Sequence, residues 1–303
     1  MENLTEILTR DEEAIFTLRS LYNKYGYSKY KMSKFEEYDL YVRNKDFLPS
    51  ENIITFTDTD GRLLALKPDV TLSIIKNSRV TEGVFKAQYN ENIYRISKGT
   101  NSFKEFMQVG LECLGAVGNK ELTEVILLAA KSLDLISESN VLEISHLDIT
   151  YGILDYAGLS EDGKKKILDC LGKKNVSGIE EVCISESVES EKTELVKKLA
   201  SVYGTPETVM PALDVFKVTK ETTSAVEQLA EIFAELKENG ISKKLCVDFS
   251  LVGDMKYYNG IAMKGFVDGI PSGILSGGQY DNMMLKMKKN ARGVGFAVYL
   301  DEL

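Results

Sequence analysis

The stretch EGVFKAQYNENIYRISKGTNSFKEFMQVGLECLG covers residues 82–115 and holds two apolar-rich runs with a short polar segment between them. Residues 82–97 and 103–115 carry Val, Ile, Phe, Tyr and Leu, which strands favour, and KGTNS at 98–102 offers Gly, Asn and Ser for a loop. We therefore predict that the two runs pair as antiparallel strands.

The residues before this pair indicate a helix and a hairpin. Thr9 and Glu12 have the spacing of a capping box, and apolar residues then recur at helical spacing, so a helix is expected to end at Gly26. An Asp-Gly pair within FTDTDGRLLAL, residues 56–66, predicts a hairpin. We also expect a strand or extended interface segment over 27–41 and a helix that begins after Pro68.

After the strand pair, the sequence pattern becomes helical and then returns to that of strands. NKELTEVILLAAKSLDLIS, residues 119–137, has one apolar helical face, and residues 150–240 resemble a series of Lys- and Glu-rich helices. A strand pattern returns in LCVDFSLV, residues 245–252, where apolar and polar residues alternate. We predict a core domain, residues 1–149 and 241–303, that is interrupted by a helical insertion over residues 150–240.

Composition excludes several classes of protein. The chain has 303 residues, of which 44% are hydrophobic and 27% charged, so it can form a full globular core. Its net charge of -9 argues against a protein that mainly wraps nucleic acid. The acidic N-terminus is unlike a signal peptide, and no apolar stretch is long enough to span a bilayer, so we expect a cytoplasmic protein without a membrane partner.

Cysteine and histidine are too few and too scattered to form a metal centre or a catalytic triad. Cys113, Cys170, Cys183 and Cys246 have no CxxC spacing, and His146 is the single histidine. The thiols are expected to be buried, and His146 is expected to be a core or edge residue. We therefore expect neither a metal nor a cofactor.

Six segments, taken in order, resemble the catalytic core of histidyl-tRNA synthetase, a class II synthetase, and more closely its shorter paralogue, the regulatory subunit of ATP phosphoribosyltransferase. Each segment alone is a weak signal, but their order is specific. They are YGYSKYKMSKFEE (25–37), LKPDVTLSI (66–74), YRISKGTNSFKEFMQVGLECLG (94–115), YYNGI (257–261), SGGQYDNMM (276–284) and ARGVGFAVYLDEL (291–303). The resemblance implies an α+β fold: a class II synthetase-like antiparallel sheet, flanked by helices, with a helical insertion.

The resemblance also implies a pocket for free histidine. Histidine presents an ammonium, an imidazole and a carboxylate, so a selective pocket needs both acceptors and donors. The implied ligand-binding residues are Asp69, Thr71 and Gln108 for the ammonium and carboxylate, Glu112 and Tyr258 for the imidazole, and Tyr257, Gly277 and Gly278 beside them. Two simpler readings stay open: Gln108 and Glu112 as solvated strand residues, and the two tyrosines as core residues.

Differences from the synthetase pattern indicate that amino-acid activation is lost. Arg95, the implied residual phosphate-binding residue, is retained, but Ser97 stands where a glutamate is usual. Glu302 and Gly253 stand where the synthetases have arginines. A carboxylate in place of a cation at a triphosphate site changes attraction into repulsion of roughly several kcal/mol.

We therefore expect a non-catalytic regulatory subunit that binds histidine and the short-form catalytic subunit of ATP phosphoribosyltransferase, in the first step of histidine biosynthesis. The C-terminal anticodon-binding domain of a synthetase is missing from the resemblance, so we expect no nucleic-acid partner. A self-dimer is also expected, although Ser33 replaces the proline usual in the dimer segment. The alternatives are an active histidyl-tRNA synthetase-like enzyme and a stand-alone amino-acid-binding or scaffold protein.

Overall fold

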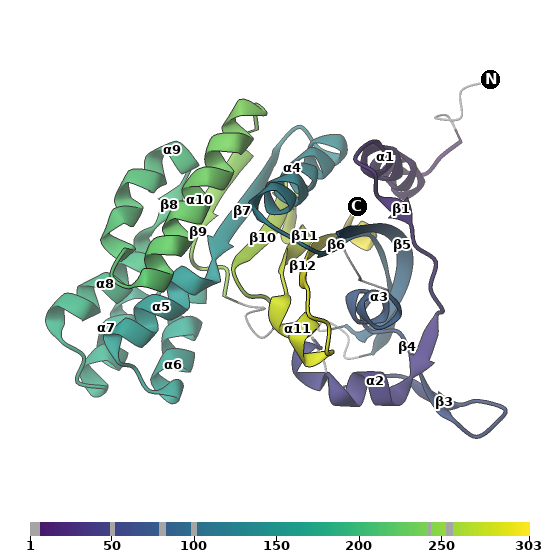
Figure 1. Ribbon diagram of the computed structural model, residues 1–303, viewed down its shortest axis with the longest axis horizontal. Coiled ribbons are helices and arrows are strands. Elements are labelled where there is room, and N and C mark those ends of the chain that lie inside the picture. Colours follow the sequence, from purple (N-terminus) through teal and green to yellow (C-terminus); the bar gives the residue numbers. More distant parts are fainter. Residues whose placement is uncertain (1–6, 49–51, 79–82, 98–101, 242–243, 253–256) are drawn as a thin grey trace.

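The computed structural model describes residues 7–48, 52–78, 83–97, 102–241, 244–252 and 257–303. Within these residues, nine strands form one large sheet, which lies at the centre of Figure 1. Its order is β1-β5-β6-β12-β11-β10-β7-β9-β8. The strands are β1 (Ser28–Lys29), β5 (Val84–Ile96), β6 (Phe103–Gly115), β7 (Asn140–His146), β8 (Tyr203–Gly204), β9 (Leu245–Asp248), β10 (Ile261–Val267), β11 (Ile270–Gln279) and β12 (Arg292–Tyr299).

The predicted strand pair is confirmed as β5 and β6, which are antiparallel from Val84 opposite Gly115 to Ile96 opposite Phe103. The central sheet is antiparallel as expected, but it also contains two parallel pairs, β1 with β5 and β7 with β9. All four residues of β9 are buried, so the alternation predicted over 245–252 does not separate a buried face from an exposed one. β9 pairs along its two edges with β7 and β8, and its side chains are buried on both faces of the sheet.

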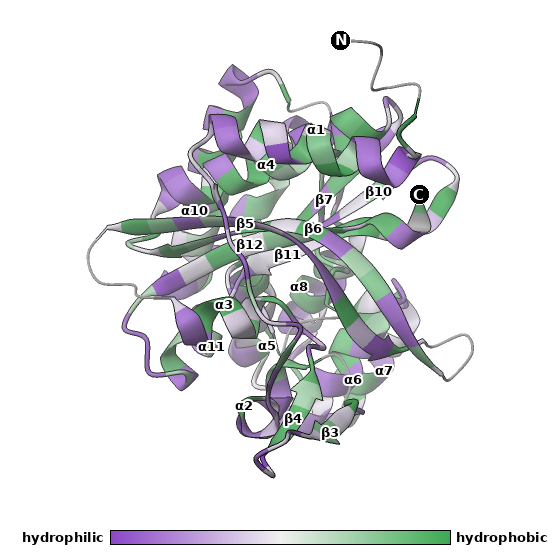
Figure 2. Cartoon of the chain, turned by 90° about the vertical axis from the view of Figure 1, so that its right-hand side faces the viewer, coloured by the Kyte–Doolittle hydropathy of each residue, from purple (hydrophilic) through white to green (hydrophobic). Residues whose placement is uncertain are grey.

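Helices cover both faces of the large sheet. In Figure 2, α1 (Arg10–Lys24) and α4 (Asn119–Ile136) lie above the sheet, while α3 (Thr71–Asn77) and α11 (Asp281–Lys286) lie below it. Helix α1 begins with the predicted capping box, in which the Thr9 backbone N–H donates to Glu12. The chain turns after α1 at Gly26, whose φ of 84° favours glycine.

A small three-stranded sheet, in the order β2-β4-β3, lies apart from the large one. Its antiparallel strands β3 (Thr55–Thr57) and β4 (Leu63–Leu66) confirm the predicted hairpin. The segment 27–41 is not one extended element, because it forms β1, then β2 (Phe35–Glu37), and then enters α2 (Tyr38–Arg43). Pairing of β2 with β4 decides this division, and a pattern within one segment does not reveal it.

Residues 150–240 are mainly helical, and Figure 1 shows their helices grouped beside the sheet. Helix α10 packs on both α4 and α5, and β8 adds to the large sheet beside β9. The division of the chain at 150 and 240 stays a prediction. The elements are α5 (Leu147–Ala157), α6 (Glu161–Gly172), α7 (Val176–Ser185), α8 (Ser190–Ser201), α9 (Pro206–Val209), the 3₁₀ segment η3 (Met210–Phe216) and α10 (Lys220–Glu238).

Two apolar clusters fill the interior. The larger cluster lies on the face of the sheet that carries α1 and α4, and it continues to α10. The smaller cluster lies on the opposite face and joins α3 and α11 to β5. Cys113, Cys183 and Cys246 are buried free thiols as expected, whereas Cys170 is half-buried. Among the described residues, no helix has the length and apolarity that a membrane crossing requires.

Candidate functional site

A cavity of about 670 Å³ opens on the face of the large sheet that carries α3. Its floor comes from β5, β6, β11 and β12, and α6 with the loop around Tyr257 contributes to its walls. A 3₁₀ turn, η2 (Lys45–Phe47), lies at its rim. Such a volume is in the range of small-molecule sites.

Glu112 of β6 lies in this cavity with only 2% of its surface exposed. Its Oε1 accepts a hydrogen bond of 2.6 Å from the Thr71 hydroxyl, and its Oε2 accepts one from the Tyr280 hydroxyl. Burial raises the pKa of Glu112 to about 8, although both hydroxyl groups oppose the rise. The carboxyl group is therefore held mainly in its protonated form at neutral pH.

Gly295 of β12 makes room for the Glu112 side chain. The two residues face each other across the β6–β12 pair, and a Cβ at position 295 would overlap Glu112 Oε2 and lie 2.5 Å from the Leu111 carbonyl oxygen. No side chain larger than glycine fits there without displacing Glu112. A backbone feature of one strand thus fixes the position of an acid on its neighbour.

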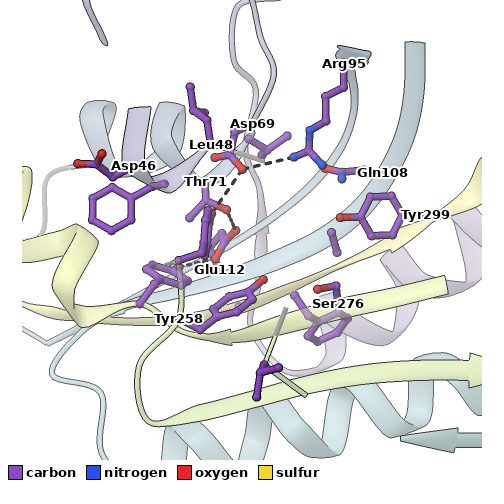
Figure 3. Close-up of a pocket in the computed structure, with 18 of the residues that line it drawn as sticks. Asp46, Leu48, Asp69, Thr71, Arg95, Gln108, Glu112, Tyr258, Ser276 and Tyr299 are labelled. Atoms are coloured by element: carbon purple, nitrogen blue, oxygen red, sulfur yellow. Dashed lines mark hydrogen bonds and ion pairs between the residues drawn. The ribbon is translucent and has the colours of Figure 1, made fainter. Parts of the chain in front are cut away.

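Asp69 is the second buried acid, at 6% exposure, and it lies just before α3. Its Oδ1 accepts a 2.8 Å hydrogen bond from the Leu72 N–H, and the Arg95 guanidinium lies 3.7 Å from its Oδ2 (Figure 3). Burial raises the pKa of Asp69, while the charge of Arg95 and the Leu72 N–H oppose the rise. Arg95 is held in turn by the Pro68 carbonyl oxygen, 2.6 Å from its Nε.

Gln108 lies four residues before Glu112 on β6, so both side chains point to the same face of the sheet. It is 3% exposed and lines the cavity. A buried amide of this kind supplies both a donor and an acceptor to a ligand.

The structure brings seven of the nine expected site residues into the lining of one cavity: Asp69, Thr71, Arg95, Gln108, Glu112, Tyr257 and Tyr258. Gly277 and Gly278 of β11 are not among the lining residues. A Cβ at Gly278 would lie 2.8 Å from the Tyr258 ring, and one at Gly277 would overlap Phe296. Gly278 therefore makes room for the Tyr258 ring, and Gly277 allows close approach of β12 at Gly295 and Phe296. A direct approach of the backbone of these glycines to a ligand stays a prediction.

Sequence reasoning missed several residues of the cavity. Tyr280 lies within the segment 276–284 that resembles the family but was not singled out, and its acidic partner could not be known before the strand order. Gly295 left a clearer signal, because an isolated glycine inside an apolar strand often marks a close approach. Tyr151 of α5 and Lys164 of α6 also line the cavity, from the predicted insertion.

At the two positions where the synthetases have arginines, the comparison rests on the sequence alone. Gly253 lies outside the described residues, and Glu302 lies in the 3₁₀ segment η5 (Leu300–Glu302), where its side chain is not described. Ser97 closes the β5–β6 connection by donating its N–H to the Ser102 carbonyl oxygen at 2.8 Å. No group of three or more His, Cys, Asp or Glu residues in the described parts of the chain is arranged to hold a metal ion.

Comparison with known proteins gives consistent similarities. The family model described as histidyl-tRNA synthetase matches residues 2–303. A curated relative from Clostridium kluyveri, named ATP phosphoribosyltransferase regulatory subunit, is 29% identical over 292 residues, which cover 94% of this chain and 74% of the relative.

Solved structures have the same fold. An ATP phosphoribosyltransferase regulatory subunit/histidyl-tRNA synthetase from Bacillus halodurans C has a TM-score of 0.86 and 22% identity, covering 99% of this chain and 80% of that chain. A chain of the ATP phosphoribosyl transferase (HisG:HisZ) complex from Thermotoga maritima has a TM-score of 0.75 and 20% identity, covering 96% and 97%. The predicted class II synthetase-like fold is confirmed.

Proposed function

Because this chain belongs to the histidyl-tRNA synthetase family, we propose that it is a histidine-binding regulatory subunit of ATP phosphoribosyltransferase that does not itself activate amino acids. The curated relative from Clostridium kluyveri carries the name of such a subunit and aligns with 94% of the chain. The cavity on the large sheet is the proposed histidine site.

The observation that carries the proposal is the set of donors and acceptors in this cavity. Asp69 and Glu112 are buried acceptors, Arg95 is a cation, and the buried Gln108 amide lines the cavity with a donor and an acceptor. Free histidine brings N–H donors on its ammonium and ring, and a carboxylate that needs a donor. We assign Asp69, Thr71 and Gln108 to the amino-acid end of the ligand, and Glu112 with Tyr258 to the imidazole.

The protonated state of Glu112 has a consequence for binding. A ligand group that donates an N–H or carries a positive charge favours the ionised carboxylate, so it lowers the pKa of Glu112 from about 8. Histidine binding near pH 7 should then release a proton. Titration calorimetry in two buffers of different ionisation enthalpy measures this release directly.

The absence of amino-acid activation is also part of the proposal. The sequence places Glu302 and Gly253 where the family has arginines, and the structure shows Arg95 held by Asp69 and the Pro68 carbonyl. An ATP-pyrophosphate exchange assay with histidine is expected to show no reaction. Exchange at the rate of a synthetase would favour the alternative, an amino-acid-activating enzyme.

The proposed partner is the catalytic subunit of a short-form ATP phosphoribosyltransferase, with a self-dimer of this chain in the assembly. The solved Thermotoga maritima complex is a precedent for the fold in such an assembly. Coupling requires that histidine bind two states of the complex with different affinity. Co-purification of this chain with the catalytic chain tests the assembly.

The test of the ligand is calorimetric titration of the chain, alone and with the catalytic subunit, with histidine and with histidinol. We expect histidine to bind at micromolar or weaker dissociation constants, about -8 kcal/mol at best, and histidinol to bind more weakly because it lacks the carboxylate. Glu112→Gln should weaken binding by a factor of tens, while Glu105→Gln, an exposed acid on the same strand, should not. Absence of binding in both states would contradict the assignment of the cavity.

A further inference from the structure

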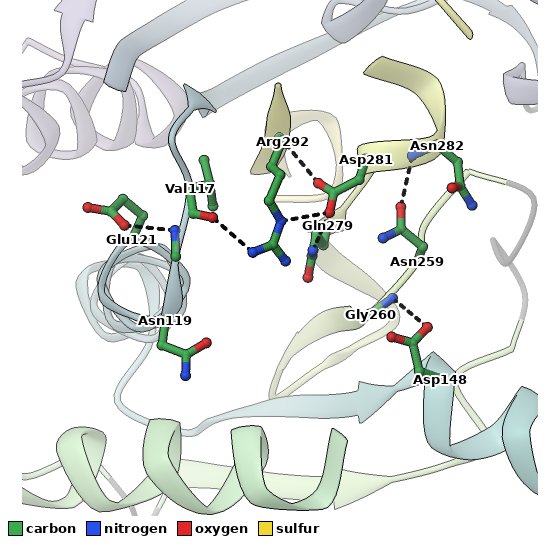
Figure 4. Close-up of polar contacts among 12 residues, drawn as sticks. Val117, Asn119, Glu121, Asp148, Asn259, Gly260, Gln279, Asp281, Asn282 and Arg292 are labelled. Atoms are coloured by element: carbon green, nitrogen blue, oxygen red, sulfur yellow. Dashed lines mark hydrogen bonds and ion pairs between the residues drawn. The ribbon is translucent and has the colours of Figure 1, made fainter. Parts of the chain in front are cut away.

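A second cavity, of about 1040 Å³, lies between α5 and α10. Its walls come from the two helices, which pack side by side in Figure 1, and Asn119 closes one end at the start of α4. In Figure 4, Asn119 and Asp148 mark the α4 and α5 sides of this region, and Asp148 accepts a hydrogen bond from the Gly260 N–H at 3.4 Å. We call this cavity the α5–α10 groove.

His146, the single histidine of the chain, lines the α5–α10 groove although only 1% of its surface is exposed. Its Nε2 lies 2.9 Å from the Gln228 carbonyl oxygen Oε1. The Gln228 amide nitrogen donates to Asn119 Oδ1 at 2.6 Å, so the amide orientation is fixed by its second partner. The Nε2 atom of His146 must therefore carry the hydrogen and donate it to Gln228.

The other ring nitrogen, Nδ1, is then an acceptor, and it has no hydrogen-bond partner among the described residues. A capping hydrogen bond to the backbone of α5 would be the usual role for this acceptor, but it is not formed. His146 occupies the N-cap position of α5, but its side chain makes no capping hydrogen bond to the first turn. Burial lowers the pKa of the imidazole, against the nearby charge of Asp148, so the ring stays neutral and keeps the Nδ1 lone pair.

Carboxylates dominate the charge of the groove. The lining includes Asp148, Asp155, Glu221, Glu227 and Glu231, whereas Lys220 is the one Lys or Arg among its described lining residues. Such a concentration of one sign attracts a ligand of the opposite sign. Asp155 is in addition paired with Lys164 at 2.5 Å, and Glu231 accepts from the Asn119 amide at 2.5 Å.

We propose that the α5–α10 groove binds a small organic cation that carries N–H donors, an alkylammonium or a guanidinium. One N–H donates to Nδ1 of His146, and the positive charge lies among the carboxylates of the groove. A quaternary ammonium ion meets the charge requirement but has no N–H, and an anionic or zwitterionic amino acid is opposed by the carboxylates.

The single histidine makes a direct test possible. In protein made with ¹⁵N-labelled histidine and without a histidine tag, the imidazole of His146 gives the only side-chain signals of its kind. Agmatine, which carries both a guanidinium and an ammonium, should shift the Nδ1 signal in a saturable way. Tetramethylammonium should bind at least tenfold more weakly. No saturable shift with agmatine, or equal binding of the two cations, would overturn the proposal.

Variants of α10 separate the groove from general surface charge. The double variant Glu227→Gln, Glu231→Gln should weaken agmatine binding at least tenfold, because it removes two carboxylates of the groove. Glu235→Gln with Glu238→Gln removes the same charge from the same helix outside the lining and should change binding less than twofold. Equal losses in both double variants would show that only overall charge matters and would contradict the site.

Two further titrations distinguish the source of the cation and the two cavities. A short arginine-containing peptide that binds while agmatine does not would overturn the small-molecule proposal in favour of a partner's side chain. Free histidine should leave the Nδ1 signal unchanged, even where calorimetry shows it to bind. The proposal for the groove and the proposal for histidine can therefore fail separately.

Discussion

The cavity around Glu112 and the α5–α10 groove each bury one ionisable side chain almost completely, yet they satisfy it differently. Both carboxyl oxygens of Glu112 accept hydrogen bonds from hydroxyl groups, of Thr71 and Tyr280. His146 has one nitrogen paired with Gln228 and one without a partner among the described residues. The side chains of the proposed histidine pocket are thus already held by other protein groups, whereas one acceptor at the groove has no donor among the described residues.

The positions of the two sites in the fold explain this difference. Glu112 lies on a central strand between β5 and β12, where the sheet fixes both the acid and the glycine that makes room for it. His146 lies at the end of β7, and its partner Gln228 comes from a helix 82 residues later. The sheet determines the first site, and the packing of α10 on α5 determines the second.

The largest expected effect is on the change of stability between pH 5 and pH 8. The pKa of Glu112 is about 8 in the folded chain and near 4.5 when unfolded, so its stabilising contribution is complete below pH 4.5 and is lost as pH rises through 8. Between pH 5 and 8 the free energy of unfolding should fall by about 4 kcal/mol through this group. Urea unfolding of Glu112→Gln should lack that part of the fall, and Glu105→Gln should keep it.

Buried Asp69 also has a raised pKa and changes stability in the same direction, so the comparison must be between wild type and variant. Equal slopes of unfolding free energy against pH in wild type and Glu112→Gln would show that the acid is not held protonated. The comparison between Glu112, which has a hydrogen-bond partner at both oxygens, and His146, which has one at a single nitrogen, would then need revision.

Gly295→Ala should have the second largest effect. The added methyl group would overlap Glu112 Oε2 and press on the Leu111 carbonyl, so we expect a loss of about 1–3 kcal/mol of stability and no histidine binding by calorimetry. Gly118→Ala is a control, because its Cβ would meet nothing closer than 3.6 Å. Normal histidine binding by folded Gly295→Ala would contradict the placement of the ligand beside Glu112.

Tyr280→Phe tests whether the hydroxyl groups organise the acid. Removal of one hydrogen bond to Glu112 should cost about 1 kcal/mol and weaken histidine binding several-fold. Tyr156→Phe, at a 41% exposed tyrosine of α5, should change neither quantity measurably. Thermal unfolding and calorimetry of the two variants provide the comparison. Equal stability and equal histidine affinity in both variants would show that the Tyr280 hydroxyl does not organise Glu112.

The smallest expected effect is that of Glu227→Gln on histidine binding. Glu227 lines the α5–α10 groove but not the pocket, so histidine affinity should change less than twofold. A tenfold change would show that the two cavities are coupled. The contact for such coupling exists, since Tyr151 lines both cavities.

Local patterns predicted the parts of the fold that depend on neighbouring residues. The β5–β6 pair and the capping box at Thr9 follow from spacing within one segment, and both are confirmed. Period-two alternation on β6 likewise places Gln108 and Glu112 on one face. The division of residues 27–41 depends on pairing with β4, so no single segment revealed it.

The candidate site was predicted through resemblance, and its residues outside the family motifs were missed. That β12 lies beside β6, and so brings Gly295 against Glu112, is a property of strand order. The link between His146 and Gln228 likewise depends on how α10 packs. A lone histidine in a strand-like run therefore indicated only a buried residue, and its unpaired nitrogen became visible in the structure.

The most direct test of the central proposal is the phosphoribosyl transfer rate of the reconstituted complex against histidine concentration, with wild-type chain and with Glu112→Gln. The variant complex is expected to keep its basal rate and to lose sensitivity to histidine by a factor of tens, which corresponds to about 2 kcal/mol of binding or coupling free energy. Glu105→Gln should respond as wild type. An unchanged response of the Glu112→Gln complex would mean that histidine is sensed elsewhere, and would contradict the account.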